Sequence, residues 1–296
     1  MRILFAGDEH PYSAFALRKA AEFAMNTWAD VALLGVIPGA PGKEMESGGD
    51  LPWPSNHPLV EALQRYREDF LSNLTGDEGP YAQMSWVYEW VRTKGGAWEE
   101  MLVRRGTRKD LKTRIRVGNV AAEIVAESRF DAADLVVLGC TKGDKCLWDN
   151  PPNVPQKVVN DVDCSVLLVK EDQPIKRILA CLDQTSVSQA SLEMINQMVT
   201  IHGAQLELIG LTKEGGAKAE AYTRMIQVGD YYSDRHVDVK TRLAEISDFE
   251  NFIAKENQED LLALWMGKKS LLERFFPRDW VGRFVSTCRS SALVLR

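Results

Sequence analysis

The sequence contains the same pattern twice, with the two copies 175 residues apart. Residues 2–8 (RILFAGD) are similar to residues 177–183 (RILACLD), and each stretch is a short apolar run that ends in an aspartate. Ser13 and Ser188 follow at the same offset, on segments with helical spacing. Internal repetition is a strong constraint on the fold, because each copy must build a similar structural unit.

Later parts of the two copies match as well. The further matching pairs are residues 134–139 (DLVVLG) with 260–267 (DLLALWMG), and 164–169 (CSVLLV) with 291–295 (SALVL). The repeat therefore predicts two domains, residues 1–173 and residues 174–296.

Apolar runs alternate with amphipathic segments along both copies, a pattern typical of α/β proteins whose parallel sheets are covered on both faces. We expect strands at residues 2–7, 30–37, 113–117, 134–138, 165–169, 176–182, 205–211, 236–240, 260–266 and 291–295. We expect helices at residues 12–28, 58–105 with interruptions, 119–130, 153–161, 186–201, 216–229, 246–257 and 279–288. Ligands of such sheets bind beyond the carboxyl ends of the strands, where Asp8, Gly139, Asp183 and Gly267 fall.

The first copy carries an insertion of 47 residues within the region 38–112. This region holds four of the eight tryptophans, Trp53, Trp86, Trp90 and Trp98. Because Trp86 and Trp90 are four residues apart, they would share one face of a helix. We expect a helical elaboration whose aromatic side chains pack onto the first domain. A lid or a surface for a protein partner is the alternative.

The composition is that of an ordinary globular protein, with 45% hydrophobic residues, 26% charged residues and a net charge of −6. It excludes a disordered chain, a collagen-like chain and a disulfide-stapled miniprotein. No apolar run approaches the ~20 residues that span a bilayer, and the apolar stretch 3–7 is too short for a signal peptide. We expect a cytoplasmic protein without a membrane partner.

The segment 92–116 breaks the acidic trend, since it carries nine basic and three acidic residues. We expect a solvated helix face followed by an alternating strand, in preference to an anion-binding patch. The acidity of the whole chain argues against a nucleic-acid partner.

Cysteines and histidines give no metal-binding pattern. The five cysteines form no CxxC pair, and the four histidines are scattered, so we expect no metal site. Cys164, Cys181 and Cys288 are expected to be buried, inert thiols. Cys140 and Cys146 fall in the expected ligand loop, where a redox-sensing role is open.

The order of these motifs resembles the universal stress protein family in its tandem two-domain form. The resemblance rests on Asp8 with Ser13 and residues 116–124 (RVGNVAAEI), 133–139 (ADLVVLG) and 166–169 (VLLV). It implies two Rossmann-like three-layer α/β/α domains of the adenine-nucleotide α-hydrolase type, each with a mostly parallel five-stranded sheet. It also implies that some members bind ATP, through an aspartate at the end of the first strand and a G-x2-G-x9-G-[ST] motif after the fourth.

Both copies depart from that ATP motif. In the first copy Gly139 is present, but Lys142 replaces the second glycine, and Pro152 and Asn153 replace the final Gly-Ser pair. Pro152 has no N–H group to give a phosphate, whereas Asn153 is expected to cap the following helix. In the second copy Gly267 is followed by Ser270, but Trp280 and Val281 stand where the Gly-Ser pair is expected, with the acid Asp279 just before them. A gapped alignment gives no Gly-Ser pair either.

The candidate ligand-binding residues lie at equivalent places in the two copies. They are Asp8, His10, Ser13, Gly139, Lys142 and Asn153 in the first copy, and Asp183, Thr185, Ser188, Gly267 and Ser270 in the second. Each aspartate either caps the turn that follows it or contacts a ribose or adenine. His10 and Ser13 lack an orienting third residue and a G-x-S-x-G elbow, so no catalytic residue is assigned.

These observations predict a non-catalytic regulatory binding protein of the stress response. Its two copies would pack as an intramolecular pseudo-dimer, and its ATP motif would be degenerate in both. One alternative is that one copy still binds ATP or a related nucleotide or anion. A nucleotide-processing enzyme is a further alternative that no catalytic constellation supports. Pairing of two chains into a homodimer through the final strands stays open.

Overall fold

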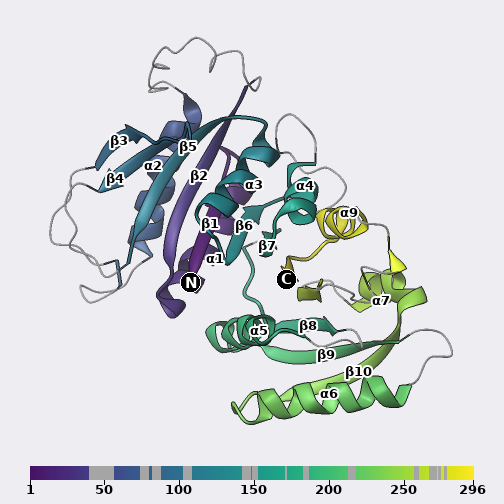
Figure 1. Ribbon diagram of the computed structural model, residues 1–296. Coiled ribbons are helices and arrows are strands. Elements are labelled where there is room, and N and C mark those ends of the chain that lie inside the picture. Colours follow the sequence, from purple (N-terminus) through teal and green to yellow (C-terminus); the bar gives the residue numbers. More distant parts are fainter. Residues whose placement is uncertain are drawn as a thin grey trace.

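The computed structural model describes residues 1–39, 57–73, 80–81, 88–102, 109–141, 148, 153–170, 172–182, 187–212, 218–256, 260–266, 272, 275–276 and 279–296 (Figure 1). In the first half the strands are β1 (Arg2–Ala6), β2 (Asp30–Pro38), β3 (Tyr88–Arg92), β4 (Trp98–Leu102), β5 (Leu111–Gly118), β6 (Leu135–Gly139) and β7 (Ser165–Val169). The helices of this half are α1 (Pro11–Thr27), α2 (Pro58–Ser72), α3 (Val120–Phe130) and α4 (Val154–Asp161).

The second half repeats this alternation. Its strands are β8 (Arg177–Leu182), β9 (Gln205–Thr212), β10 (Val239–Glu245), β11 (Leu261–Trp265) and β12 (Ala292–Leu295). Its helices are α5 (Gln189–His202), α6 (Lys218–Ser233), the 3-10 helix η1 (Ile246–Asp248), α7 (Phe249–Glu256) and α9 (Trp280–Thr287).

The described strands form one continuous 12-stranded sheet, in the order β10-β9-β8-β11-β12-β7-β6-β1-β2-β5-β4-β3. Each half contributes five parallel strands. When these five are numbered along the chain within each half, they lie across the sheet in the order third, second, first, fourth, fifth in both halves. This arrangement confirms the predicted α/β class and its mostly parallel sheets. The two expected sheets are nevertheless not separate, because β7 and β12 pair with each other.

The β7–β12 pair is antiparallel, with Leu293 opposite Leu167. These are the last strands of the two halves, and the edge of each strand that faces away from its own half is hydrogen-bonded to the other strand. Neither edge is therefore available to a second chain, and a homodimer through the final strands is excluded in this fold.

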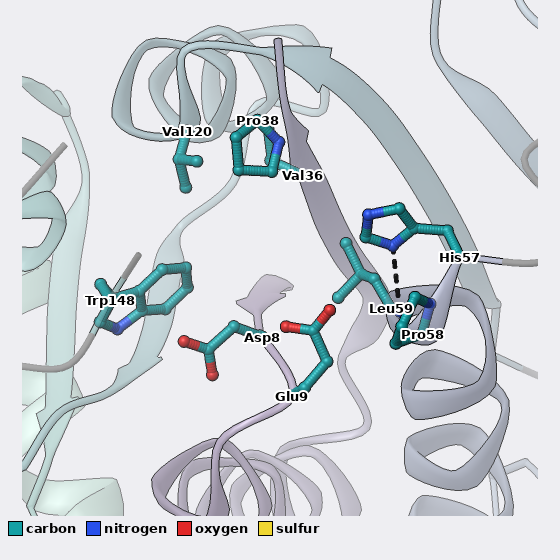
Figure 2. Close-up of a pocket in the computed structure, with 9 residues that line it drawn as sticks. All are labelled: Asp8, Glu9, Val36, Pro38, His57, Pro58, Leu59, Val120 and Trp148. Atoms are coloured by element: carbon teal, nitrogen blue, oxygen red, sulfur yellow. Dashed lines mark hydrogen bonds between the residues drawn. The ribbon is translucent and has the colours of Figure 1, made fainter. Parts of the chain in front are cut away.

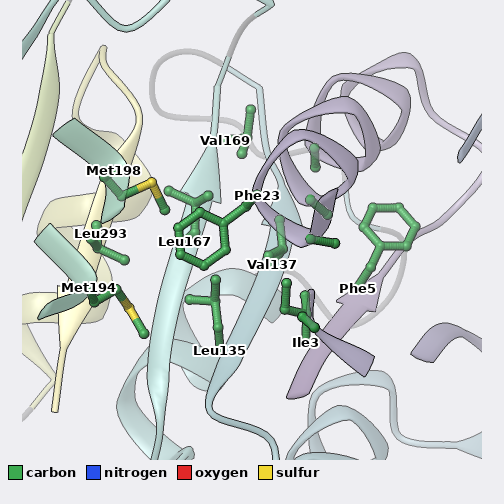
Figure 3. Packing of buried hydrophobic residues seen from close by; sticks show 14 of the residues in the cluster. Ile3, Phe5, Phe23, Leu135, Val137, Leu167, Val169, Met194, Met198 and Leu293 are labelled. Carbon is green, nitrogen blue, oxygen red and sulfur yellow. The ribbon is translucent and has the colours of Figure 1, made fainter. Parts of the chain in front are cut away.

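Two hydrophobic clusters, one on each face of the sheet, hold the helices in place. One face is covered by α1, α2, α5 and α6, and the other by α3, α4, α7 and α9. Each cluster runs across both halves. In Figure 3, Phe23 of α1 and Leu167 of β7 lie near Met198 of α5 and Leu293 of β12, and all four are at most 2% exposed. Strands buried on both faces explain the nearly unbroken apolar runs in the sequence.

The expectation of helices over residues 58–105 is wrong beyond Ser72. Strands β3 and β4 form an antiparallel hairpin, and β4 adds to the edge of β5, with Trp98 opposite Ile115. Gly96, with φ +79, lies in the turn between them, a conformation that glycine adopts without strain. Trp90 lies in β3, so its predicted helical face does not exist; Trp53 and Trp86 lie outside the described residues.

The expected packing of the tryptophans onto the first domain is found for the two that are described. Trp90 and Trp98 are partly buried against the core cluster that contains α1 and α2. On the same face of the hairpin, Arg67 of α2 forms an ion pair with Glu100 and lies 4.0 Å from the ring centre of Tyr88.

The expected solvated helix face is wrong for the described part of the basic segment 92–116, which runs through β3, β4 and β5. The expected strand at 113–117 is found as β5, but two of its basic side chains are buried. Arg114 and Arg116 of β5 are 3% and 9% exposed. Arg114 pairs with Glu99 of β4 at 2.9 Å and with Glu127 of α3 at 2.5 Å, and Arg116 also bonds to Glu127. These buried ion pairs attach the inserted hairpin and β5 to α3.

Candidate functional site

A pocket of about 300 Å³ opens at the carboxyl ends of β1 and β2, beside the first turns of α2 and α3 (Figure 2). Its described lining consists of Asp8, Glu9, Val36, Pro38, His57, Pro58, Leu59, Val120 and Trp148. This is the edge at which parallel α/β sheets bind their ligands, and its volume lies at the lower end of roughly 300–1,000 Å³ for ligand pockets.

The carboxylate of Asp8 is already saturated by its own chain. Oδ1 accepts hydrogen bonds from the Ser13 hydroxyl at 2.8 Å and the His10 backbone N–H at 3.1 Å. Oδ2 accepts one from the Tyr12 hydroxyl and lies 3.0 Å from Nδ1 of His10. Because a carboxylate has about four acceptor sites, Asp8 has none left for a ligand. Its geometry is that of a residue that fixes the turn between β1 and α1.

Ser13 and His10 take part in the same turn. Ser13 is fully buried, and its hydroxyl oxygen also accepts from the backbone N–H of Asp8 at 3.1 Å. The ring of His10 stacks on Tyr12, with ring centres 5.3 Å apart. Within the part of the chain that the structure describes, no hydrogen bond joins the side chains of His10 and Ser13.

Gly139 at the end of β6 is packed against α1. A Cβ atom at Gly139 would lie 2.4 Å from the carbonyl oxygen of Tyr12, which is backbone and cannot turn aside. The carbonyl oxygen of Gly139 accepts a hydrogen bond of 2.7 Å from Nε1 of Trp148. Close packing thus explains this glycine without a bound phosphate.

Replacing Gly139 with alanine is expected to lower the free energy of unfolding by about 1–3 kcal/mol, since the added methyl group would force β6 and α1 apart. Urea denaturation of the ligand-free protein measures this. Gly229→Ala on α6 is the matched control, because no atom lies within 4 Å of the new methyl group and alanine favours a helix. Equal stability of Gly139→Ala and the unchanged protein would contradict the packing explanation.

Tyr66 of α2 also holds the backbone of Asp8 in place. Its hydroxyl donates a hydrogen bond of 2.6 Å to the backbone carbonyl of Asp8. Burial, together with the negative charge of Asp8, raises the pKa of Tyr66 to about 12. The phenol is therefore protonated at neutral pH and acts as a donor that fixes the end of β1.

The charge of the described pocket lining is negative. Asp8 and Glu9 supply two carboxylates, and no lysine or arginine stands among its described lining residues. Nδ1 of His57 accepts a hydrogen bond of 3.2 Å from the backbone N–H of Leu59.

The sequence profile of the universal stress protein family matches residues 1–170, more than half of the chain. The chain belongs to the universal stress protein family. No curated protein is significantly similar to it in sequence.

Solved structures agree with the fold of this universal stress protein. A universal stress protein from Archaeoglobus fulgidus DSM 4304 is similar, with a TM-score of 0.58, 13% identity, and coverage of 100% of this chain and 98% of that one. A protein of unknown function from Pseudomonas aeruginosa PAO1 has a TM-score of 0.55 and 13% identity, and the match covers 99% of this chain and 92% of that one. The cytoplasmic domain of a prokaryotic cation chloride cotransporter has a TM-score of 0.52 and 9% identity, and the match covers 99% of this chain and 94% of that one. At these identities the likeness shows the fold alone.

The remaining candidate residues of this universal stress protein fall into two groups. Lys142, Asp183, Thr185, Gly267 and Ser270 lie outside the described residues, as does Cys146. Asn153 and Ser188 are described. Asn153 precedes α4 with φ +77 and makes no side-chain hydrogen bond to the helix, so the expected cap is wrong. Ser188 caps α5 by accepting from the backbone N–H of Ser191 at 3.1 Å.

The described cysteines fall into two classes. Cys164, Cys181 and Cys288 are free, and burial raises the pKa of all three thiols, to about 11 for Cys164, so they stay protonated at neutral pH. Cys140 is disulfide-bonded. The described residues contain no group of three or more metal-binding side chains, and none of the described helices is long and apolar enough to cross a membrane.

The sequence patterns did not indicate Glu9, His57 and Trp148, which line the pocket, or Tyr12, which donates a hydrogen bond to Asp8. Glu9 follows Asp8 directly and Tyr12 comes four residues after it, so their nearness in the sequence was a usable signal. His57 and Trp148 come from distant segments, and only the tertiary fold brings them to β1.

Proposed function

We propose that this universal stress protein is a non-catalytic, regulatory binding protein of the stress response that does not use ATP. The observation that carries the proposal is the Asp8 carboxylate. The residue that the family resemblance assigns to adenine or ribose has its four acceptor positions occupied by Tyr12, His10 and Ser13.

Charge supports the same conclusion. A triphosphate would enter a pocket whose described lining carries two carboxylates and no cationic side chain. Like charges at short range in a partly buried site repel strongly. The space beside the Cα atom of Gly139, the first glycine of the ATP motif, is filled by Tyr12 and is not open to a phosphate.

We also propose that the chain works as an intramolecular pseudo-dimer of residues 1–173 and 174–296. Its support is the β7–β12 pair, the cores shared by both halves, and the contact of α4 with α9. At that contact the backbone N–H of Gly282 donates to Asn160 Oδ1 at 3.1 Å. A Cβ atom at Gly282 would lie 2.4 Å from the carbonyl oxygen of Gln156, so the two helices approach as closely as glycine allows.

Thermal unfolding with ATP and Mg²⁺ tests the proposal. A site with a dissociation constant of ~10 μM would stabilise the protein by about 2.7 kcal/mol at 1 mM ATP. We expect no increase in the midpoint temperature, because ATP finds no free acceptor at Asp8 and no cationic side chain among the described lining residues. A midpoint raised by ATP and not by an equal concentration of inorganic triphosphate would overturn the proposal and favour a retained nucleotide site.

A further inference from the structure

We propose that the pocket beside Asp8 and Glu9 binds a small organic cation, a protonated amine on a hydrocarbon body. The inference rests on the proposed function, in which this pocket no longer takes ATP. It follows from the charge, the lining and the size of the pocket.

Glu9 is the group that would meet the ammonium. Its side chain is exposed, it lines the pocket, and it has no ion-pair or hydrogen-bond partner among the described residues. The Asp8 carboxylate is the second negative charge. Its hydrogen bonds leave no acceptor free, so it acts on a ligand through its field. Two like charges beside low-dielectric walls raise the local concentration of cations.

The rest of the lining suits a hydrocarbon body. Figure 2 shows the carboxylates of Asp8 and Glu9 between Trp148 on one side and Leu59 on the other, with Val36 and Val120 completing the apolar wall. Trp148 is 5% exposed and is held by its hydrogen bond to the carbonyl of Gly139. The indole ring is thus a fixed apolar part of the wall, against which the hydrocarbon body of a ligand would pack.

The lining also argues against other ligands of similar size. An anion would meet the charge of Glu9, and no lysine or arginine stands among the described lining residues to offset it. A neutral ligand would gain the apolar contacts but not the ion pair. The volume of about 300 Å³ fits a molecule with one small ring or a short chain, and is at the small end for a nucleotide.

Isothermal titration calorimetry in phosphate buffer, which contains no competing amine, tests the inference on the full chain. The probes are 2-phenylethylamine, 2-phenylethanol and phenylacetate, which share a body and differ in charge. We expect the amine to bind at least about fivefold more tightly than the alcohol, and phenylacetate not to bind. Glu9→Gln should abolish the advantage of the amine and leave the alcohol unchanged. Glu68→Gln, an equal charge change on the exposed side of α2, should alter neither.

Equal binding of amine and alcohol, binding of phenylacetate, or no binding of any probe would overturn the inference. ATP titrated in the same series separates this failure from that of the proposed function. If ATP also gives no heat, the proposed function stands and only the cation site is lost. If ATP binds, the proposed function is lost as well.

Discussion

Replacing Glu127 with alanine is expected to lower the free energy of unfolding by about 3–5 kcal/mol, the largest effect of any single change considered for this protein. Glu127 of α3 is fully buried and accepts hydrogen bonds from Arg114 and Arg116 on β5. Removing it leaves two buried guanidinium groups without their shared acceptor. Losing one partner of a buried ion pair costs far more than the pair contributes.

The pKa of Arg114 shows how much the surrounding carboxylates matter. Burial alone would lower the pKa of this guanidinium, but the hydrogen bond and charge of Asp131, with the charges of Glu127 and Glu99, raise it above its ordinary value. The network thus compensates the desolvation of a charge at the point where the inserted hairpin meets the parallel sheet.

Urea denaturation followed by circular dichroism measures the effect of Glu127→Ala. Glu123→Ala is the matched control on the same helix, because Glu123 is 26% exposed and, among the described residues, its one ion pair is with Arg116 at 3.0 Å. The free energy of unfolding of Glu123→Ala should be less than about 1 kcal/mol below that of the unchanged protein. Similar losses for the two variants would show that the buried network does not hold the hairpin.

The second large effect concerns Lys170, whose contribution to stability should change by about 3 kcal/mol between pH 8 and pH 10.5. Lys170 follows β7 at the junction of the two halves and is 3% exposed. Its ammonium donates to the carbonyl of Ser286 at 2.5 Å in the second half and to that of Thr141 at 3.3 Å in the first. No carboxylate pairs with it among the described residues, and the neighbouring Cys288 thiol is protonated because burial raises its pKa.

The direction of the pH effect follows from the pKa of the buried amine. Burial lowers the pKa of Lys170 from 10.5 to about 8. Between these values the unfolded chain binds a proton at this amine and the folded chain does not. The contribution of Lys170 to the free energy of unfolding is therefore complete above pH 10.5. It is lost as the pH falls to about 8, because the buried amine must then be charged in the folded chain.

A comparison with Lys170→Met measures this contribution together with its coupling to the Cys288 thiol, since the other titrating groups are shared. The free energy of unfolding of the unchanged protein, relative to that of Lys170→Met, should rise with pH across this window. Lys157→Met, which removes an exposed amine on α4, should give a curve parallel to that of the unchanged protein. Parallel curves for Lys170→Met would contradict a buried, uncompensated ammonium.

The regular parts of the fold were predictable because their signal is local. Apolar runs and turn residues located β1, β6 and β7 to within a residue or two. The edge strand β10 was predicted about three residues early, since few of its residues are buried and its periodicity is weak. The β3–β4 hairpin was missed because a spacing of four residues fits one face of a strand as well as one face of a helix.

Less of the candidate site could be predicted. The repeat and the family resemblance located Asp8 and Gly139 at strand ends and Ser13 on the helix that follows the first strand, which is where they lie. Their roles depend on neighbours that the sequence does not reveal. Tyr66 reaches Asp8 from a distant segment, and Trp148 bonds to the carbonyl of Gly139 from the loop that follows β6. These contacts make the expected ligand groups parts of the local structure.

Native mass spectrometry of the freshly purified full chain is the most direct test of the central claim that this universal stress protein has lost its ATP site. We expect one species with the mass of the chain and no nucleotide, both as purified and after addition of Mg²⁺ and 1 mM ATP. A species of the unchanged protein that is heavier by the mass of one ATP, and that is absent from the spectrum of Asp8→Asn, would contradict the loss of the ATP site.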